Sequence, residues 1–169
     1  LILIEHLQGI CMLAINPHTL SEHTRSVILK QCIDAEVRIL QTGLNHMDYV
    51  PRNIILQGSD YDTPDLQVKV IDFNCCILMA HPNNTDEYDK HIMRSLKKRA
   101  PKLANPVMRY IYGLEEFADL GWCSESRSEW ERWLWKTFGN DDRYATVKWD
   151  GMPRTTPKYV NEDGELEDF

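Results

Sequence analysis

The sequence predicts a mainly α-helical protein of the α+β class, in which a small β-hairpin is joined to a helical region. Three observations lead to this expectation. One long stretch carries apolar residues at helical spacing, two short apolar stretches are separated by turn residues, and the second half contains three further helical patterns. The 169 residues are enough for one domain with one hydrophobic core.

The composition excludes several classes of function. Apolar residues make up 43% of the chain, and the net charge of −7 disfavours binding to nucleic acid or anionic lipid. The five cysteines are odd in number and form no C-x-x-C, which argues against a disulfide framework and a zinc finger. The longest apolar run, residues 75–80, is too short to cross a bilayer. We therefore expect a cytoplasmic protein with neither a membrane nor a nucleic acid as partner.

The first half begins with a strand and a long helix. Residues 1–7 are predicted to form a strand that ends near Gly9. The run Thr19-Leu20-Ser21-Glu22 has the capping-box pattern, a hydroxyl followed three residues later by a glutamate. With Gly43 as the stop, we expect a helix over residues 20–42. Its apolar residues at helical spacing are Ile28, Cys32, Ala35 and Ile39.

A β-hairpin with a long tip is expected after this helix. Residues 53–56 and 66–73 are short and apolar, as strands of a small sheet would be. The residues between them that favour turns are Gly58, Ser59, Asp60 and Pro64. The two cysteines that follow, Cys75 and Cys76, are expected to be small buried residues.

Three helices and a tail are expected in the second half. Residues 86–99 and 107–120 form the first two helical patterns. The third helix should start after Ser124 or Ser126 and run through Phe138, with its tryptophans packed mainly in the core. Residues 151–169 are predicted to form an extended, solvated tail. Its last acidic residues are Glu162, Asp163, Glu165, Glu167 and Asp168.

Three residues have the chemistry that phosphoryl transfer needs. A carboxylate must orient the attacking hydroxyl and take up its proton, and Asp48 can supply it. Hard oxygen ligands must hold Mg²⁺, and Asn53 and Asp72 can supply these. A lone H-x-D or a lone Asp-Phe is common by chance. Here H-x-D-x-x-x-x-N runs directly into an apolar strand, and V-K-V-I-D-F follows the hairpin tip, which makes the combination specific.

These segments resemble the protein-kinase-like superfamily. Residues 46–53 resemble its catalytic loop, H-R-D-x-x-x-x-N, and residues 71–74 resemble its D-F-G metal-binding motif. The run Leu3-Ile4-Glu5-His6-Leu7 is similar to the end of the fifth strand and the hinge of that fold. The resemblance is clear over residues 1–74 and vague beyond them.

The resemblance implies that residues 1–150 form the helical C-terminal lobe of a kinase-like fold. Within this lobe, residues 1–9 would be the hinge strand, residues 19–43 the long helix, residues 46–74 the catalytic loop and metal motif, and residues 75–150 the helical subdomain. Residues 151–169 would be the acidic tail. The implied cofactors are ATP and Mg²⁺.

The resemblance also assigns roles to individual residues. The backbone of Glu5 and Leu7 would bind adenine, with Ile4 at the gatekeeper position and Ile55 packed under the base. Asp48 would be the catalytic base. The metal ligands would be Asn53 and Asp72.

The departures from the family pattern restrict these expectations. Met47 replaces the Arg of H-R-D, so control through a phosphorylated activation loop is not expected. Val50 stands where many kinases carry a Lys, and Arg52 either supplies the missing positive charge or is a surface residue. Asn74 replaces the Gly of D-F-G, and we expect the turn to survive because Asn tolerates a positive φ. Lys102 reverses the charge required in an A-P-E motif.

Two functions remain open from the sequence. The first is an ATP-dependent phosphotransferase acting on a hydroxyl acceptor, either a protein Ser, Thr or Tyr or a small molecule. The apolar start and the lack of a G-x-G predict a fragment with reduced or no activity alone. The second is a catalytically inactive kinase-like module, a pseudokinase, that binds a protein partner through its helical lobe.

Overall fold

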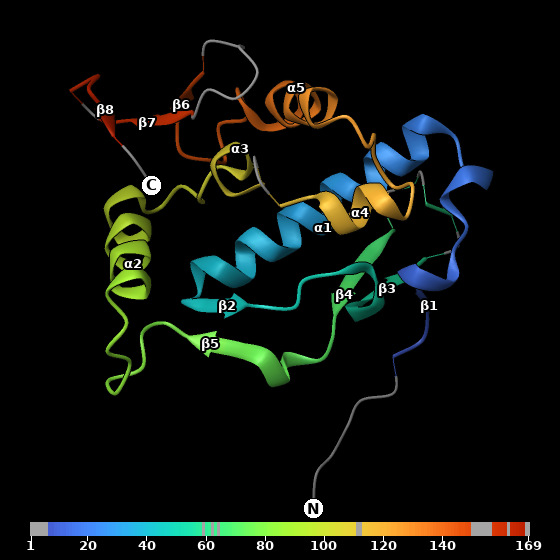
Figure 1. Cartoon of the computed structure of the whole chain (residues 1–169), viewed down its shortest axis with the longest axis horizontal. Coiled ribbons are helices and arrows are strands. Elements are labelled where there is room, and N and C mark those ends of the chain that lie inside the picture. Colours follow the sequence, from blue (N-terminus) through green and yellow to red (C-terminus); the bar gives the residue numbers. More distant parts are fainter. Residues whose placement is uncertain are drawn as a thin grey trace, which may run out of the picture.

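The computed structural model describes residues 7–58, 60–61, 63, 65–110, 113–149, 157–161 and 163–167. Within these residues the protein has five α-helices and small antiparallel sheets, so the predicted mixed α+β class is confirmed (Figure 1). The predicted strand over residues 1–7 lies almost wholly outside the described residues. None of the helices in the described part is both long and apolar enough to span a membrane.

Helix α1, Glu22–Gln41, is confirmed, but its N-terminal cap differs from the prediction. The Ser21 hydroxyl, and not that of Thr19, accepts the hydrogen bond from the Thr24 amide, at 3.0 Å. Thr19 instead ends a short 3-10 turn, Pro17–Thr19, and its hydroxyl donates backwards to the Asn16 carbonyl. Because that turn uses Thr19, the helix starts two residues later than the capping-box pattern implied. Gly43, with φ +89°, ends it as expected.

The core lies along α1, which crosses the middle of the molecule (Figure 1). One side of α1 is fully buried and packs on β2, β4 and α3, while its opposite side carries charged residues. The buried side chains of this face are Ile28, Leu29, Cys32, Ile33, Val37 and Leu40. Of the residues whose spacing predicted the helix, Ile28 and Cys32 lie on this face, whereas Ala35 and Ile39 are half-buried beside it.

Two small antiparallel sheets flank the segment that contains Asp48. The predicted hairpin is confirmed: β3, Ile54–Gln57, pairs with β4, Gln67–Val70, and β1, Ile10–Cys11, pairs with the other edge of β3. In this sheet Ile54 lies opposite Val70. The second sheet pairs β2, Leu44–His46, with β5, Cys76–Leu78. Further 3-10 turns cover Met12–Ala14, Pro51–Asn53 and Phe73–Cys75.

The helices of the second half differ in part from the expectation. Helix α2, Glu87–Arg99, is confirmed and is capped by the Asp86 carboxylate. The helix predicted over residues 107–120 is wrong as one unit, because the structure has α3, Pro106–Tyr110, and α4, Glu115–Asp119. The Gly113 amide donates to the Tyr110 carbonyl and closes a turn between them. Helix α5, Arg127–Phe138, is confirmed and buries Trp130, Leu134 and Phe138.

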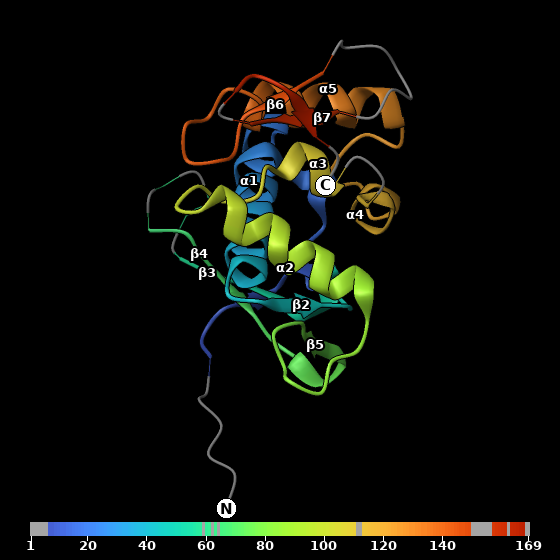
Figure 2. The same cartoon turned by 90° about the vertical axis from the view of Figure 1, so that its left-hand side faces the viewer.

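The prediction of a solvated tail is wrong for part of residues 151–169. Strands β6, Val147–Lys148, β7, Lys158–Val160, and β8, Leu166–Glu167, form a small sheet beside α5 (Figures 1 and 2). Tyr159 is only 1% exposed, and its hydroxyl accepts a hydrogen bond from the Asn105 amide at 3.2 Å. The acidic composition concealed this anchor, in which Tyr159 buries its ring and its hydroxyl has a hydrogen-bond partner, as is usual for buried tyrosines.

Candidate active site

The segment that resembles a kinase catalytic loop, residues 46–53 and called the catalytic loop below, is held between the two sheets. It leaves β2 at His46, turns through Asp48 and enters β3 at Ile54. Pro51 starts the intervening 3-10 turn with its fixed φ, and Val50 before it is extended, as a residue before proline prefers. Asn53 closes that turn at 5% exposure. The local sequence thus places Asp48 and Asn53 at the two ends of one tight turn.

Asp48 is fixed by side chains at both of its carboxylate oxygens. The Asn53 Nδ2 donates to Asp48 Oδ2 at 2.8 Å and to the Asp48 carbonyl at 2.9 Å. The Arg52 Nη2 donates to Asp48 Oδ1 at 2.5 Å. The Asp48 side chain is still 29% exposed, and each oxygen keeps a lone pair. The carboxylate is therefore oriented and remains reachable by a hydroxyl group.

The structure brings Asp72 close to Asn53 in the backbone. The Ile71 amide donates to the Asn53 carbonyl at 2.9 Å, which continues the β3–β4 pairing by one residue. Asp72, the next residue, is exposed and adopts a left-handed conformation with φ 58°. The expectation that Asn74 would carry the positive φ is wrong. Asn74 lies in a 3-10 turn, and its Nδ2 donates to Asp72 Oδ1 at 2.8 Å.

Asn53 and Asp72 are suitable ligands for Mg²⁺. The Asn53 amide uses its nitrogen for Asp48, and no described residue donates to its Oδ1. Asp72 uses Oδ1 for Asn74, and no described residue donates to its Oδ2. Mg²⁺ is commonly held by one or two protein oxygens together with water and phosphate oxygens. In the described part of the chain there is no larger group of His, Cys, Asp and Glu suited to a metal.

His46 joins the catalytic loop to the Asp72 segment, a role that our sequence analysis did not assign. Its ring is 2% exposed, and its Nε2–H donates to the Ile71 carbonyl at 3.1 Å. The ring also contacts Phe73, with centroids 5.0 Å apart, and Tyr49, at 5.8 Å. Our sequence analysis used His46 only to recognise the H-x-D motif. Its fixed spacing from Asp48 was the signal that it could connect the two segments.

Tyr49 connects the catalytic loop to the core. Its hydroxyl donates to the Cys32 carbonyl of α1 at 2.6 Å, and burial raises the pKa of this phenol well above its usual range. Its ring stacks on Phe117 of α4, with centroids 6.5 Å apart. Tyr49 therefore fixes the position of the loop relative to both helices.

The residues expected to bind adenine are described only in part. Ile4 and Glu5 lie outside the described residues, and Leu7 is half-buried. Ile55 is half-buried on β3, opposite Cys11 of β1. Gly9 lies so close to β3 that a Cβ atom there would be 2.7 Å from Ile55 Cγ2. The structure thus brings the chain that follows Leu7 against Ile55.

The expectation for the cysteines after the metal motif is wrong. Cys75 is exposed and Cys76 is half-buried. Burial, Cys75 and Asp72 together raise the pKa of the Cys76 thiol. Within the apolar run of residues 75–80, the strand β5 exposes Ile77 and Leu78, whereas Met79 is buried in the core.

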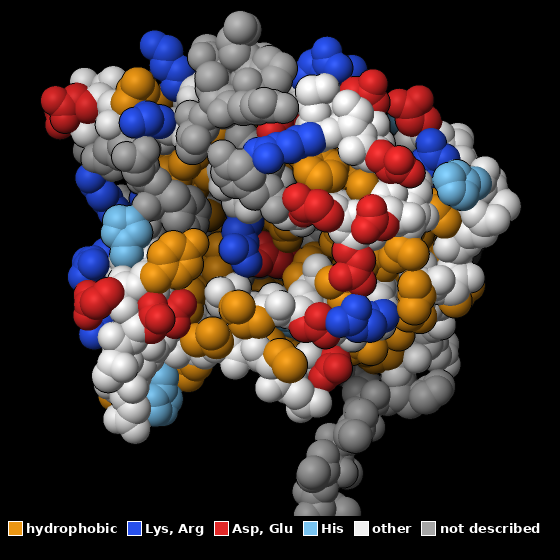
Figure 3. All heavy atoms as spheres, viewed as in Figure 1, with side chains coloured by type: hydrophobic (Ala, Val, Ile, Leu, Met, Phe, Trp, Pro, Cys, Tyr) orange, Lys and Arg blue, Asp and Glu red, His pale blue; other side chains and the backbone are white. Residues whose placement is uncertain are grey.

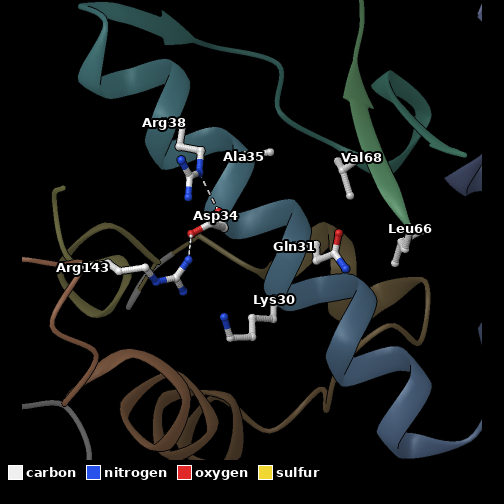
Figure 4. Close-up of a pocket in the computed structure, with 8 residues that line it drawn as sticks. All are labelled: Lys30, Gln31, Asp34, Ala35, Arg38, Leu66, Val68 and Arg143. Carbon is white, nitrogen blue, oxygen red and sulfur yellow. Dashed lines mark hydrogen bonds and ion pairs between the residues drawn. The ribbon is translucent and has the colours of Figure 1, made fainter. Parts of the chain in front are cut away.

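A separate pocket of about 400 Å³ lies on the charged side of α1 (Figure 4). At its centre the Asp34 carboxylate accepts hydrogen bonds from Arg38 at 2.7 Å and Arg143 at 3.2 Å, and Lys30 lies nearby. Burial raises the pKa of Asp34, but the hydrogen bonds from Tyr144 and Arg38 outweigh it, and the pKa falls. This cluster connects α1 to the chain that follows α5, and its chemistry is that of a structural ion-pair network.

Comparisons of the chain with family models, with curated proteins and with solved structures give no match. Any function must therefore be argued from the motif residues and their geometry.

Proposed function

We propose that this protein is a kinase-like phosphotransferase that moves the γ-phosphate of ATP to a hydroxyl acceptor with the help of Mg²⁺. The proposal includes the finer fold, the C-terminal lobe of a protein-kinase-like enzyme, and a cytoplasmic location. The observation that carries it is the arrangement of Asn53. Its amide nitrogen orients the Asp48 carboxylate, and its amide oxygen stays free for a metal ion.

Each residue has one task in the proposed reaction. Asp48 orients the attacking hydroxyl and accepts its proton, and Asn53 and Asp72 offer oxygens to the metal. Bound Mg²⁺ would bridge phosphate oxygens and neutralise their charge. Arg52 has one nitrogen on Asp48 and lies half-exposed beside it, where its charge can face a phosphate. The backbone around Leu7 and the side chain of Ile55 would form one wall for adenine.

The acceptor is a hydroxyl group of a protein or of a small molecule. Met47, in place of the Arg of H-R-D, is 59% exposed and carries no charge that could pair with a phosphate group. This supports an enzyme that does not use a phosphorylated activation loop as its switch.

The test is ADP release from Mg·ATP against a panel of protein and small-molecule hydroxyl acceptors. Asp48→Asn should lower turnover by about 10²–10⁴-fold, because removal of a general base costs that much. Asp142→Asn is the matched control, since Asp142 is exposed, forms no described ion pair and lies outside the motifs. Equal activity in both variants would rule out the role of Asp48.

An inactive kinase-like module that binds a partner is the second candidate, and a specific observation supports it. Phe73, Ile77 and Leu78 are 46%, 36% and 48% exposed on consecutive parts of one segment, an unusual concentration of large apolar side chains on a surface. Asp72→Ala discriminates between the two functions. If the protein is an enzyme, this variant should lose all turnover. If it is an inactive module, the variant should still bind the partner protein.

A further inference from the structure

Arg52 contacts two carboxylates that come from distant parts of the chain. Its Nη2 donates to Asp48 Oδ1 at 2.5 Å, and its Nη1 donates to Glu116 Oε1 at 3.1 Å. Glu116 lies 64 residues further along the chain, in α4. Figure 3 shows acidic side chains gathered over α4 and the neighbouring surface, with basic atoms among them.

We infer that Glu116 is a positioning residue, which acts through Arg52 to hold the Asp48 carboxylate in the orientation that phosphoryl transfer needs. This inference rests on the proposed phosphotransferase function. Glu116 forms no hydrogen bond to Asp48, so its effect must pass through the guanidinium group.

The geometry of the guanidinium group supports this role. The group is planar and presents its donors in a fixed fork, so two bound nitrogens define its plane. With Nη1 held by Glu116, Arg52 donates to Asp48 through Nη2 alone. Asn53 holds the other oxygen of Asp48. The carboxylate is thus fixed from both sides, and each oxygen keeps room for the acceptor hydroxyl.

Glu116 is itself held in place by its neighbours in α4. Phe117 is 2% exposed and stacks on Tyr49 of the catalytic loop, and Ala118 is 3% exposed. Because Tyr49 is bonded to α1, the stacking joins α4 to the catalytic loop in a defined position. The fixed backbone of α4 therefore places Glu116 within reach of Arg52.

The ion pair contributes little to stability, which makes its kinetic role testable. The side chains of Arg52 and Glu116 are 50% and 46% exposed, and exposed pairs of this kind are weak. Glu116→Gln replaces the charge-assisted hydrogen bond to Nη1 of Arg52 by a weaker neutral one, so the guanidinium is held less firmly on Asp48. The catalytic step then slows, while ATP binding on the side of Ile55 stays the same.

The experiment compares Glu116→Gln with Glu115→Gln, a matched control that removes the same charge from the preceding exposed residue. Turnover is measured as ADP release from Mg·ATP with the hydroxyl acceptor of the panel that gives the highest rate. We expect Glu116→Gln to lower kcat roughly tenfold, as a small misplacement of a reacting group does, with an unchanged KM for ATP. Glu115→Gln should leave both constants unchanged. The unfolding midpoints of the two variants should agree.

A double-mutant cycle decides whether the effect passes through Arg52. In an Arg52→Gln background, Glu116→Gln should cause no further loss of kcat, because the connecting group is already gone. Full additivity of the two losses, or equal effects of Glu116→Gln and Glu115→Gln, would overturn the inference alone. Absence of turnover in the unchanged protein with every acceptor of the panel would refute the proposed function, and with it this inference.

Discussion

Replacing Asn53 with alanine removes the group that orients Asp48. The substitution deletes two hydrogen bonds from a residue that is 5% exposed, one to the Asp48 carboxylate and one to the Asp48 carbonyl. A hydrogen bond to a charged group contributes about 1.5–3 kcal/mol and a neutral one about 1 kcal/mol. Asp48 is 29% exposed, so water replaces part of this loss. We expect the free energy of unfolding to fall by about 2–3 kcal/mol.

The assay is thermal and urea unfolding, followed by tryptophan fluorescence. For a domain of this size the expected loss lowers Tm by roughly 5–10 °C. Asn74→Ala is the matched control, because Asn74 also donates to an aspartate but lies exposed, and it should cost less than about 0.5 kcal/mol. The reasoning is refuted if the two variants unfold at the same urea concentration. It is refuted equally if Asn53→Ala is destabilised while its turnover stays unchanged.

Three further predictions concern the scaffold. Arg109→Met should cost about 3 kcal/mol in urea unfolding, because it leaves the carboxylate of Glu36, which is 1% exposed, without its partner; an unchanged unfolding midpoint would contradict this. Asp34→Asn should destabilise the protein at neutral pH and have no effect in acid, because the lowered pKa of Asp34 adds stability that is lost as the pH falls through that pKa. Urea unfolding of both proteins over this pH range tests it, and a difference in unfolding free energy that does not change with pH would contradict it. A thiol reagent should modify exposed Cys75 first and leave Cys32 unmodified until the protein unfolds, since burial raises the pKa of the Cys32 thiol. Mass spectrometry of the labelled peptides measures the order of modification, and early labelling of Cys32 would contradict the prediction.

The parts of the fold that the sequence predicted are those with a local cause. The apolar spacing of α1 and the turn residues between β3 and β4 each act within a few residues, and both elements were found where expected. The hydrogen bonds between Asn53 and Asp48 were not predicted, although only one tight turn separates the two residues. Local patterns of this kind survive folding because tertiary contacts reinforce them.

The parts that the sequence did not predict depend on contacts between distant residues. The break between α3 and α4 fits the stacking of Phe117 on Tyr49, and Gly113 was the local signal for it that our sequence analysis did not use. Likewise, Tyr159 is buried, although the acidic residues near it predicted an extended, solvated tail. The positive φ at Asp72 shows another failure of local reasoning. Asn74 tolerates a positive φ equally well. In the structure, however, Asp72 has the positive φ, and in this arrangement the Asn74 side chain donates to the Asp72 carboxylate.

The charge balance of the candidate site gives a physical reason for a metal-dependent reaction. Asp48, Glu116 and Asp72 carry three carboxylates, and Arg52 supplies the one guanidinium bonded to any of them among the described residues. A triphosphate that approached these groups alone would meet a net negative charge. Mg²⁺ would remove this repulsion and at the same time use the oxygens that Asn53 and Asp72 leave free. The same excess of carboxylates explains why Arg52 is held by two partners. A guanidinium shared between Asp48 and Glu116 keeps the base oriented without neutralising it fully, which is the condition that the proposed reaction requires of its base.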